Sequence, residues 1–449
     1  MKEGHPERLP ALLPHLRTVA DAAFEREDEQ AAALCITLGT HLRMVGVYEE
    51  AESYLRRALG IAQNLYGEEH VKFARGLFNL ANLQQVQGKY EAARSSFRQA
   101  LAISQKELGE GHPKTAACLS SLADVLREQG KYDEARLYAE RALLVTKKAY
   151  GEGHPETTHQ LDVLGVVLAE QGNLSEARPI LERALLVREE TLGEGHPETA
   201  TALNNLAGTL VQQGDLAEAI PMFERALTIV EGSLGKEHPG LVASLNNFAH
   251  ALRDRGFYDE ARSYAERSLA IRKRTLGEDH PETARAVGLL ALVLQGQGNF
   301  SEARLLYERA LAILEAVFGE HPNTAMVLNS LANLLLQRGD LPEARRLHQR
   351  TLATRKKVLG AEHYLTAMSF HNLANVLALQ GDFVEARRLH ERALDILEKS
   401  LPTEHPDELN MVINGLTNLL VNHSQYGEAQ RLHERLLRAR EGILARNTL

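Results

Sequence analysis

A histidine recurs along almost the whole chain, at positions 70, 112, 154, 196, 238, 280, 321, 363 and 405. Seven of the eight intervals are 42 residues long and one is 41. Glycines and alanines recur in step with these histidines, so that Gly130 and Ala135 return as Gly172 and Ala177. A fixed period of this length is typical of stacked supersecondary units that contact mainly their neighbours. The sequence therefore predicts one long array of units and not several separate globular domains.

Each unit has the pattern of two helices. In the third unit we expect the first helix over residues 113–129, because apolar residues recur at 119, 122, 123 and 126, on one helical face. Pro113 is tolerated at the first helical position, and Gly130 can end the helix with a positive φ. The second helix is expected over 133–150, where small alanines on the inner face allow close packing. The chain is therefore expected to be all-α.

No such helix pair can bury its apolar stripe alone, so stacking of neighbours must create the core. We expect ten pairs in residues 29–443, after a capping segment in residues 1–28 and before a disordered tail in residues 444–449. The tenth pair is degenerate, because His423 and Ser424 replace the turn glycine of the other units.

Composition limits the classes of partner. The chain has 51 Lys and Arg against 60 Asp and Glu, a formal net charge of −9, which argues against a broadly basic nucleic-acid-binding protein. Cys35 and Cys118 lie on apolar helix faces, and we expect buried, reduced thiols in a cytoplasmic protein. The N-terminus has no apolar signal segment, and the longest apolar run, at 286–294, is too short to cross a bilayer. We expect no membrane partner.

The in-register histidines suggest metal binding only at first sight. Each lies in a different unit, whereas a metal ion needs its ligands about 2 Å from one centre. Most are followed by proline at the entrance to a helix, where a side chain can cap free N–H groups. The zinc-protease, phosphate-loop and nucleophile-elbow motifs are absent. We therefore expect no enzymatic activity, no cofactor and no metal.

The fifth unit shows the family resemblance most clearly. It contains LNNLA at 203–207, QG at 213–214, EA at 218–219 and FERAL at 223–227. These motifs resemble the tetratricopeptide repeat (TPR) in its 42-residue form, as in kinesin light chains. The stretch PHLRTVADAAFERE at 14–27 is similar to the start of the TPR arrays of bacterial NB-ARC/STAND-type ATPases. The resemblance implies a right-handed α-solenoid, or superhelix, with an N-terminal capping helix and a concave groove lined by the first helices.

Polar residues, many of them asparagines, flank the apolar stripe of these first helices, and the resemblance places them in the groove. An asparagine amide can pair with an extended peptide backbone whatever its sequence. Alternatively, the amides bond neighbouring helices and set the superhelix. The candidate binding residues are Asn79, Asn82, Asp124, Asn204, Asn205, Asn246, Asn247, His250, Asn329, Asn333, Asn372, Asn375, Asn414 and Asn418. Apolar residues that interrupt this series form either ligand pockets or packing contacts: Val163, Val166, Leu289 and Leu292.

The functional expectation is a non-enzymatic scaffold or adaptor that binds a protein or peptide partner in the concave groove. One alternative is the ligand-sensing arm of a STAND/NB-ARC-type ATPase. A second is a kinesin-light-chain-like cargo adaptor. A nucleotide-binding module upstream in the source would favour the sensing arm, and an upstream heptad segment would favour the cargo adaptor.

Overall fold

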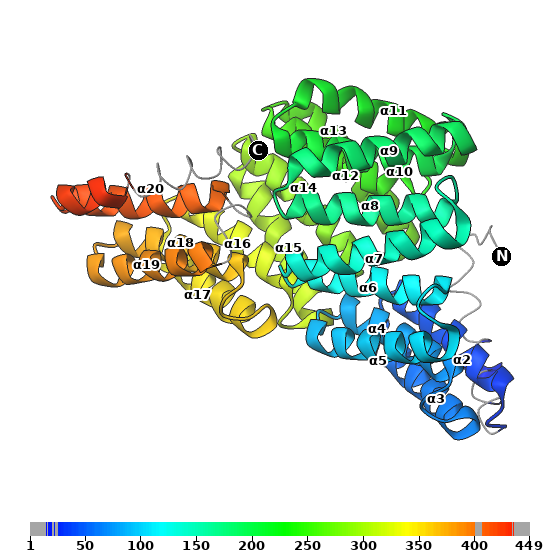
Figure 1. The fold of residues 1–449 in the computed structure, drawn as a ribbon. Coiled ribbons are helices and arrows are strands. Elements are labelled where there is room, and N and C mark those ends of the chain that lie inside the picture. The colour runs from blue at the N-terminus through cyan, green and yellow to red at the C-terminus, as the bar shows by residue number, and fades with distance from the viewer. Residues whose placement is uncertain are drawn as a thin grey trace. The chain divides into compact units, whose positions relative to one another are not determined.

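The computed structural model describes residues 26–399 and 406–432, together with residues 15, 17–19, 22 and 434. The expected tail and most of the expected capping segment lie outside these residues. The described part contains helices and no strand (Figure 1). The helices are α2 (Glu29–Met44), α3 (Tyr48–Tyr66), α4 (Val71–Val86), α5 (Tyr90–Leu108), α6 (Pro113–Glu128), α7 (Tyr132–Tyr150), α8 (Pro155–Glu170), α9 (Leu174–Leu192), α10 (Pro197–Gln213), α11 (Leu216–Leu234), α12 (Leu241–Asp254), α13 (Tyr258–Leu276), α14 (Pro281–Gly296), α15 (Phe300–Phe318), α16 (Pro322–Gln337), α17 (Leu341–Val358), α18 (Tyr364–Leu379), α19 (Phe383–Lys399) and α20 (Pro406–Asn422). None of the described helices is long and apolar enough to span a membrane.

The third repeat confirms the expected helix pair. Helix α6 ends one residue before its expected end, and α7 begins one residue before its expected start. Leu119, Leu122 and Leu126 are at most 1% exposed, so the apolar stripe of α6 is buried. Gly130 has φ 67, the left-handed conformation that the short turn between the helices requires.

The recurring histidines cap the first helices. At each of the eight recurring histidines that lie in the described residues, Nδ1 accepts a hydrogen bond from the backbone N–H two residues further on, at 3.0–3.2 Å. His196, for example, caps α10 through the N–H of Glu198. A helix start leaves its first N–H groups without partners, and the imidazole satisfies one of them. The described residues contain no cluster of three His, Cys, Asp or Glu side chains that could hold a metal ion.

A second bond joins the end of one repeat to the start of the next. Thr199 Oγ1 donates to the carbonyl oxygen of Gly193 at 2.9 Å and thereby ties the end of α9 to the first turn of α10. The threonine is fully buried, so the bond is protected from water. The same bond occurs at Thr115, Thr157, Thr283 and Thr366.

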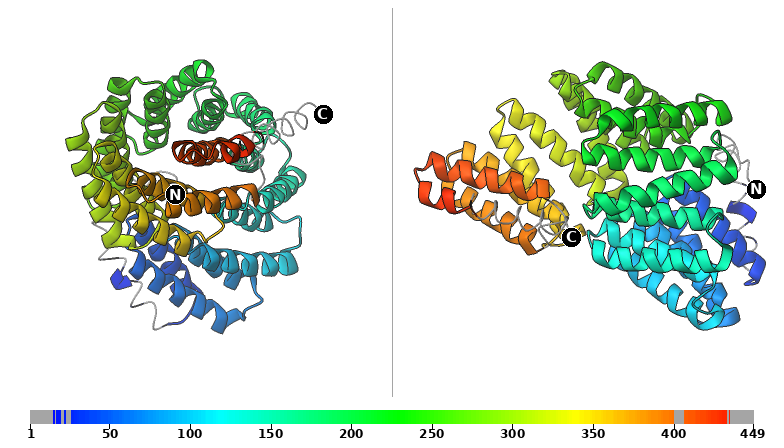
Figure 2. Two further views of the ribbon diagram at one scale, coloured as in Figure 1. Left: turned by 90° about the vertical axis from the view of Figure 1, so that its left-hand side faces the viewer. Right: turned by 45° about the horizontal axis from the view of Figure 1, so that its top comes forward.

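The helices form two compact units. The first comprises residues 1–169 and 174–289, and the second residues 170–173 and 290–449. In the first unit, α2 packs on α3, α4 on α5 and α6 on α7. Second helices also pack on the next first helix, as α3 does on α4 and α5 on α6. Figure 2 shows the helices of this unit following one another round an arc, from blue through cyan to green.

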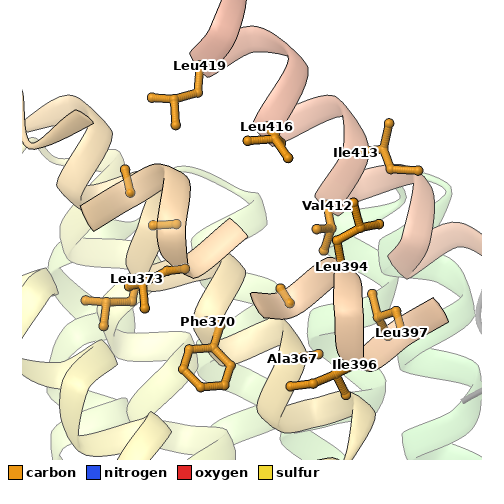
Figure 3. Close-up of a cluster of buried hydrophobic side chains, with 14 of the residues drawn as sticks. Ala367, Phe370, Leu373, Leu394, Ile396, Leu397, Val412, Ile413, Leu416 and Leu419 are labelled. Atoms are coloured by element: carbon orange, nitrogen blue, oxygen red, sulfur yellow. The ribbon is translucent and has the colours of Figure 1, made fainter. Parts of the chain in front are cut away.

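The core of the second unit is best seen between α18, α19 and α20. Phe370 and Leu373 of α18, Leu394 of α19, and Leu416 of α20 are all buried in one cluster (Figure 3). Each of the three helices contacts the other two. A single pair could not enclose this cluster, which agrees with the expectation that stacking creates the core.

Candidate functional site: the face of the first helices

First helices of successive repeats touch one another, as α2 and α4 do, and likewise α10 and α12, and α18 and α20. Within each unit, the faces of the first helices that are turned away from the second helices therefore form a surface that passes from one repeat to the next. The sequence places its candidate asparagines on this surface. Whether an amide there can take a ligand depends on whether a protein group already occupies it.

Several of the amides are occupied within their own repeat. Asn79 Nδ2 donates to the carbonyl oxygen of Arg75 at 2.8 Å, and Asn82 Nδ2 donates to that of Phe78 at 3.0 Å. Both partners lie one turn earlier on the same helix, a local bond that short polar side chains make readily. Part of the hydrogen-bonding capacity of these two amides is therefore used within their own helix.

Other amides join helices. Asn204 is buried, and its Nδ2 donates both to the Ala200 carbonyl oxygen at 3.0 Å and to Ser244 Oγ of the next repeat at 2.5 Å. These bonds favour the architectural alternative for this candidate binding residue. Asn246 Oδ1 accepts from Ser268 Oγ at 2.6 Å, which ties α12 to α13.

The second unit uses its amides in the same way. Asn372 Nδ2 donates to Asn329 Oδ1 of the preceding repeat at 2.9 Å. Asn375 Nδ2 lies 3.0 Å from His371 Nε2 on the same helix. The bond between Asn372 and Asn329 favours the architectural alternative for part of the series, because it holds one first helix against the next.

In five candidates the side-chain amide has no hydrogen-bond partner within the described residues: Asn205, Asn247, Asn333, Asn414 and Asn418. Of these, Asn247, Asn414 and Asn418 are exposed, and the other two are half-buried. Their role in binding stays a prediction.

The two charged or titratable candidates each have a cation nearby. Asp124 Oδ1 lies 3.6 Å from Arg127 Nε, and Arg253 Nη1 lies 3.4 Å from His250 Nδ1. Both cations are close sequence neighbours on the same helix. The carboxylate and the imidazole therefore do not stand alone on the surface.

The apolar candidates are mostly packing residues. Val163 is 8% exposed and belongs to a cluster with Ala139, Leu164 and Ala177, and Leu289 is 6% exposed. Val166 and Leu292 are half-buried. For Val163 and Leu289 the burial favours the packing alternative, because neighbouring side chains already cover them.

A pocket that the sequence did not suggest lies between α4, α5 and α6. Its volume is about 310 Å³, near the lower end of ordinary ligand sites. Its apolar lining is made by Val71, Ala74, Phe78, Ala117 and Cys118, and Ser104 adds a hydroxyl group. Its remaining lining residues are three cations, namely Lys72, Arg75 and Lys114.

These cations differ in how far they are neutralised. Lys72 Nζ lies 2.6 Å from Glu29 Oε2 and 3.1 Å from the Tyr66 hydroxyl, and the bond to Glu29 raises the pKa of Lys72. Arg75 and Lys114 are exposed and have no ion pair among the described residues. The pocket therefore presents two exposed cations beside an apolar wall, one of which, Arg75, also acts on the Glu29 carboxylate. This arrangement suits a ligand that joins an anionic group to an apolar one.

A sequence signal for this pocket did exist. Lys72 and Lys114 lie in the first turn of α4 and α6, where the helix dipole favours negative charge. Three other repeats carry glutamate at the equivalent position, at Glu156, Glu198 and Glu282. Lys72 is compensated by its bond to Glu29, whereas Lys114 opposes the local electrostatic preference without an ion pair among the described residues. The cation at Lys114 therefore indicates a requirement other than stability.

Family models of the tetratricopeptide repeat match nearly the whole described chain. The matched segments are 32–71, 72–148, 123–185, 156–232, 199–255, 240–316 and 317–399. Together they cover far more than half of the sequence, so the chain belongs to the tetratricopeptide repeat family. Proteins with this repeat are typically scaffolds for protein interactions.

Solved structures give more distant likenesses. A Podosopora anserina protein described as a kinesin light chain with nearly identical TPR-like repeats is 27% identical, over 46% of this chain and 97% of that one, with a TM-score of 0.38. BtubC (BKLC) from P. vanneervenii is 25% identical, over 52% and 91%, with a TM-score of 0.41. A Rap protein in complex with competence and sporulation factor is 18% identical, over 79% and 99%, with a TM-score of 0.49. A search of curated proteins finds no match. The resemblance to NB-ARC-type arrays stays a prediction.

Proposed function

We propose that the chain is a protein-interaction scaffold that anchors an extended peptide segment of its partner on the face of the first helices. The observation that carries the proposal is the pocket between α4 and α6, with its apolar wall and the exposed cations Arg75 and Lys114. The chemistry that would recognise it is an acidic side chain, or a terminal carboxylate, next to a large apolar side chain. The unoccupied amides, such as Asn247, would then pair with the peptide backbone further along.

The charge of Lys114 supports this function because it does not support the fold. Lys114 opposes the dipole of α6, an effect of about 0.3–1 kcal/mol at an exposed site. Replacing it with glutamine should therefore leave folding unchanged or slightly improved. A residue kept against the local preference for stability is the pattern expected of a binding residue.

The test uses short peptides of defined chemistry. A series with glutamate beside phenylalanine is titrated against the protein by fluorescence anisotropy, in parallel with a series that has glutamine in place of glutamate. We expect the acidic series to bind more tightly, with an affinity that falls as salt rises. Lys114→Gln and Arg75→Gln should each weaken binding about fivefold, the effect of losing about 1 kcal/mol from a partly exposed charged contact.

The matched control is Lys148→Gln. Lys148 is an exposed lysine in the last turn of α7, outside the pocket, and its removal should leave affinity unchanged. Equal affinity for the two peptide series, or equal effects of Lys114→Gln and Lys148→Gln, would exclude the pocket as the anchor. A protein that binds no peptide of either series would contradict the proposed function itself.

The two thiols agree with a reducing cytoplasm as the place where this scaffold works. Cys35 and Cys118 are both free and buried, and a pair of unbridged cysteines is usual where thiols are kept reduced.

A further inference from the structure

Within the first unit, the turn of the first repeat touches the start of the seventh. A Cβ atom added to Gly46, between α2 and α3, would lie 2.9 Å from Cδ2 and 3.1 Å from Nε2 of His280. His280 is the residue that caps α14. Repeats so far apart in the sequence do not meet in an array with contacts between successive repeats only.

The environment of Tyr48 supports the same contact. Tyr48, at the start of α3, is 8% exposed. Burial raises the pKa of Tyr48 to about 12, and the carboxylate of Glu282 in α14 adds to this rise.

The contact buries polar groups. His280 is 7% exposed, and burial lowers its pKa, although a hydrogen bond with the backbone of Met44 opposes this shift. Arg43, beside it at the end of α2, loses solvation and has no described carboxylate partner, so that burial lowers its pKa. Such groups cost free energy when they are covered, and the cost offsets much of the apolar gain.

We propose that the turn at residues 45–47 and the start of α14 form an intramolecular latch, which opens and closes while the repeats themselves stay folded. Closing it joins the two ends of the arc formed by the first six repeats. Opening it frees the arc to change its curvature, and with it the spacing of the first helices that carry the peptide-binding face. The latch does not depend on which ligand that face binds.

Gly46 offers an unusually well-matched test. Gly46 and Gly256 occupy the same turn position in different repeats, and both have φ 82. A Cβ at Gly256 would meet nothing within 4 Å. Gly46→Ala and Gly256→Ala therefore introduce the same backbone strain, but only the first opposes the contact with His280. The imidazole cannot swing aside freely, because its Nδ1 holds the N–H of Glu282 at 3.0 Å.

Hydrogen exchange followed by mass spectrometry reads the latch directly. In Gly46→Ala we expect the amides of residues 282–288 to exchange about tenfold faster than in the unaltered protein, whereas Gly256→Ala should leave them unchanged. Equal exchange of residues 282–288 in the two variants would overturn the proposal.

A second variant keeps the test decisive if Gly46→Ala proves unstable. His280→Asn retains a good N-cap but removes the imidazole from the contact, and His196→Asn makes the same change at a cap without the contact. We expect faster exchange of residues 42–52 in His280→Asn only. Equal exchange rates of residues 42–52 in the two histidine variants would show that contact with the seventh repeat does not stabilise the first.

Discussion

Ser424 has a backbone conformation that is unfavourable for a residue with a Cβ atom. It has φ 60, in the left-handed region, where the equivalent residue of the ninth repeat is Gly381 with φ 85. The turn is otherwise the same, because the N–H of Ser424 donates to the Val421 carbonyl oxygen and that of Gly381 to the Ala378 carbonyl oxygen. The tenth pair therefore forms the usual turn at a cost of about 1–2 kcal/mol that glycine would avoid.

We predict that Ser424→Gly stabilises the tenth pair by about 1 kcal/mol, since the greater freedom of glycine in the unfolded chain offsets part of the gain. The tenth pair should also fray before the fifth, because its turn carries this strain. Hydrogen exchange at α20 should become about fivefold slower in the variant. Gly381→Ser, the reverse change one repeat earlier, should speed exchange in α18. An α20 that is as well protected as α10 in the unaltered protein would contradict both expectations.

At the scale of helices, three of them enclose an unusual pair of histidines. His371 of α18 and His390 of α19 are 5% and 1% exposed, and their ring centroids lie 5.1 Å apart. Gly415 of α20 makes room for them, since a Cβ there would lie 2.8 Å from Cε1 of each ring. The equivalents of His390 in earlier repeats include Phe97 and Phe223, so imidazole replaces an ordinary core side chain.

Burial lowers the pKa of His371 to about 4, and burial together with the neighbouring His371 lowers that of His390 to about 3. No carboxylate acts on either ring, and the nearby Asn375 amide is neutral. Both pKa values lie below the unfolded value of about 6.5, so the folded state is favoured above that pH and loses stability as the pH falls from there.

We predict that α18–α20 unfold between about pH 6 and pH 4, before α10–α13. His390→Phe removes one titrating group and should move this acid transition to lower pH. Far-ultraviolet circular dichroism gives the midpoint, and hydrogen exchange identifies the helices that open. His196→Asn, at a half-buried cap of the first unit, should leave the midpoint unchanged. If His390→Phe unfolds at the same pH as the unaltered protein, the histidine pair is not the acid-sensitive group.

These elements mark how far the sequence could predict the molecule. Helix bounds follow from a period that local chemistry repeats, so α6 and α7 were predicted to within a residue at the ends that face their turn. The hydrogen-bond partners of the asparagine side chains could not be predicted, because they depend on how adjacent helices meet. Asn329 finds Asn372 one repeat later, whereas Asn205 finds no described partner. The pocket at Lys114 was missed because its signal, a cation opposing the dipole, is visible only by comparing repeats.

At the scale of the molecule, the latch changes what the repeat architecture predicts for unfolding. An array with contacts only between neighbours can lose a central repeat and leave two folded flanks that melt independently. In the first unit those flanks also meet through Gly46 and His280, so the two ends of the arc are coupled. Leu206 lies in α10, between the flanks, and is 2% exposed.

We predict that Leu206→Ala destabilises the fifth repeat by about 2–5 kcal/mol, the usual cost of a cavity at a buried leucine. While the latch is closed, α4–α7 and α12–α13 should still unfold at the same urea concentration, because each flank is held to the other. In Leu206→Ala with Gly46→Ala, the two flanks should unfold at different urea concentrations. Exchange-detected urea titration distinguishes these cases, and Leu206→Ala with Gly256→Ala is the control for backbone strain. Separate unfolding of the flanks in Leu206→Ala alone would mean that neighbour contacts hold the first unit together without help from the latch.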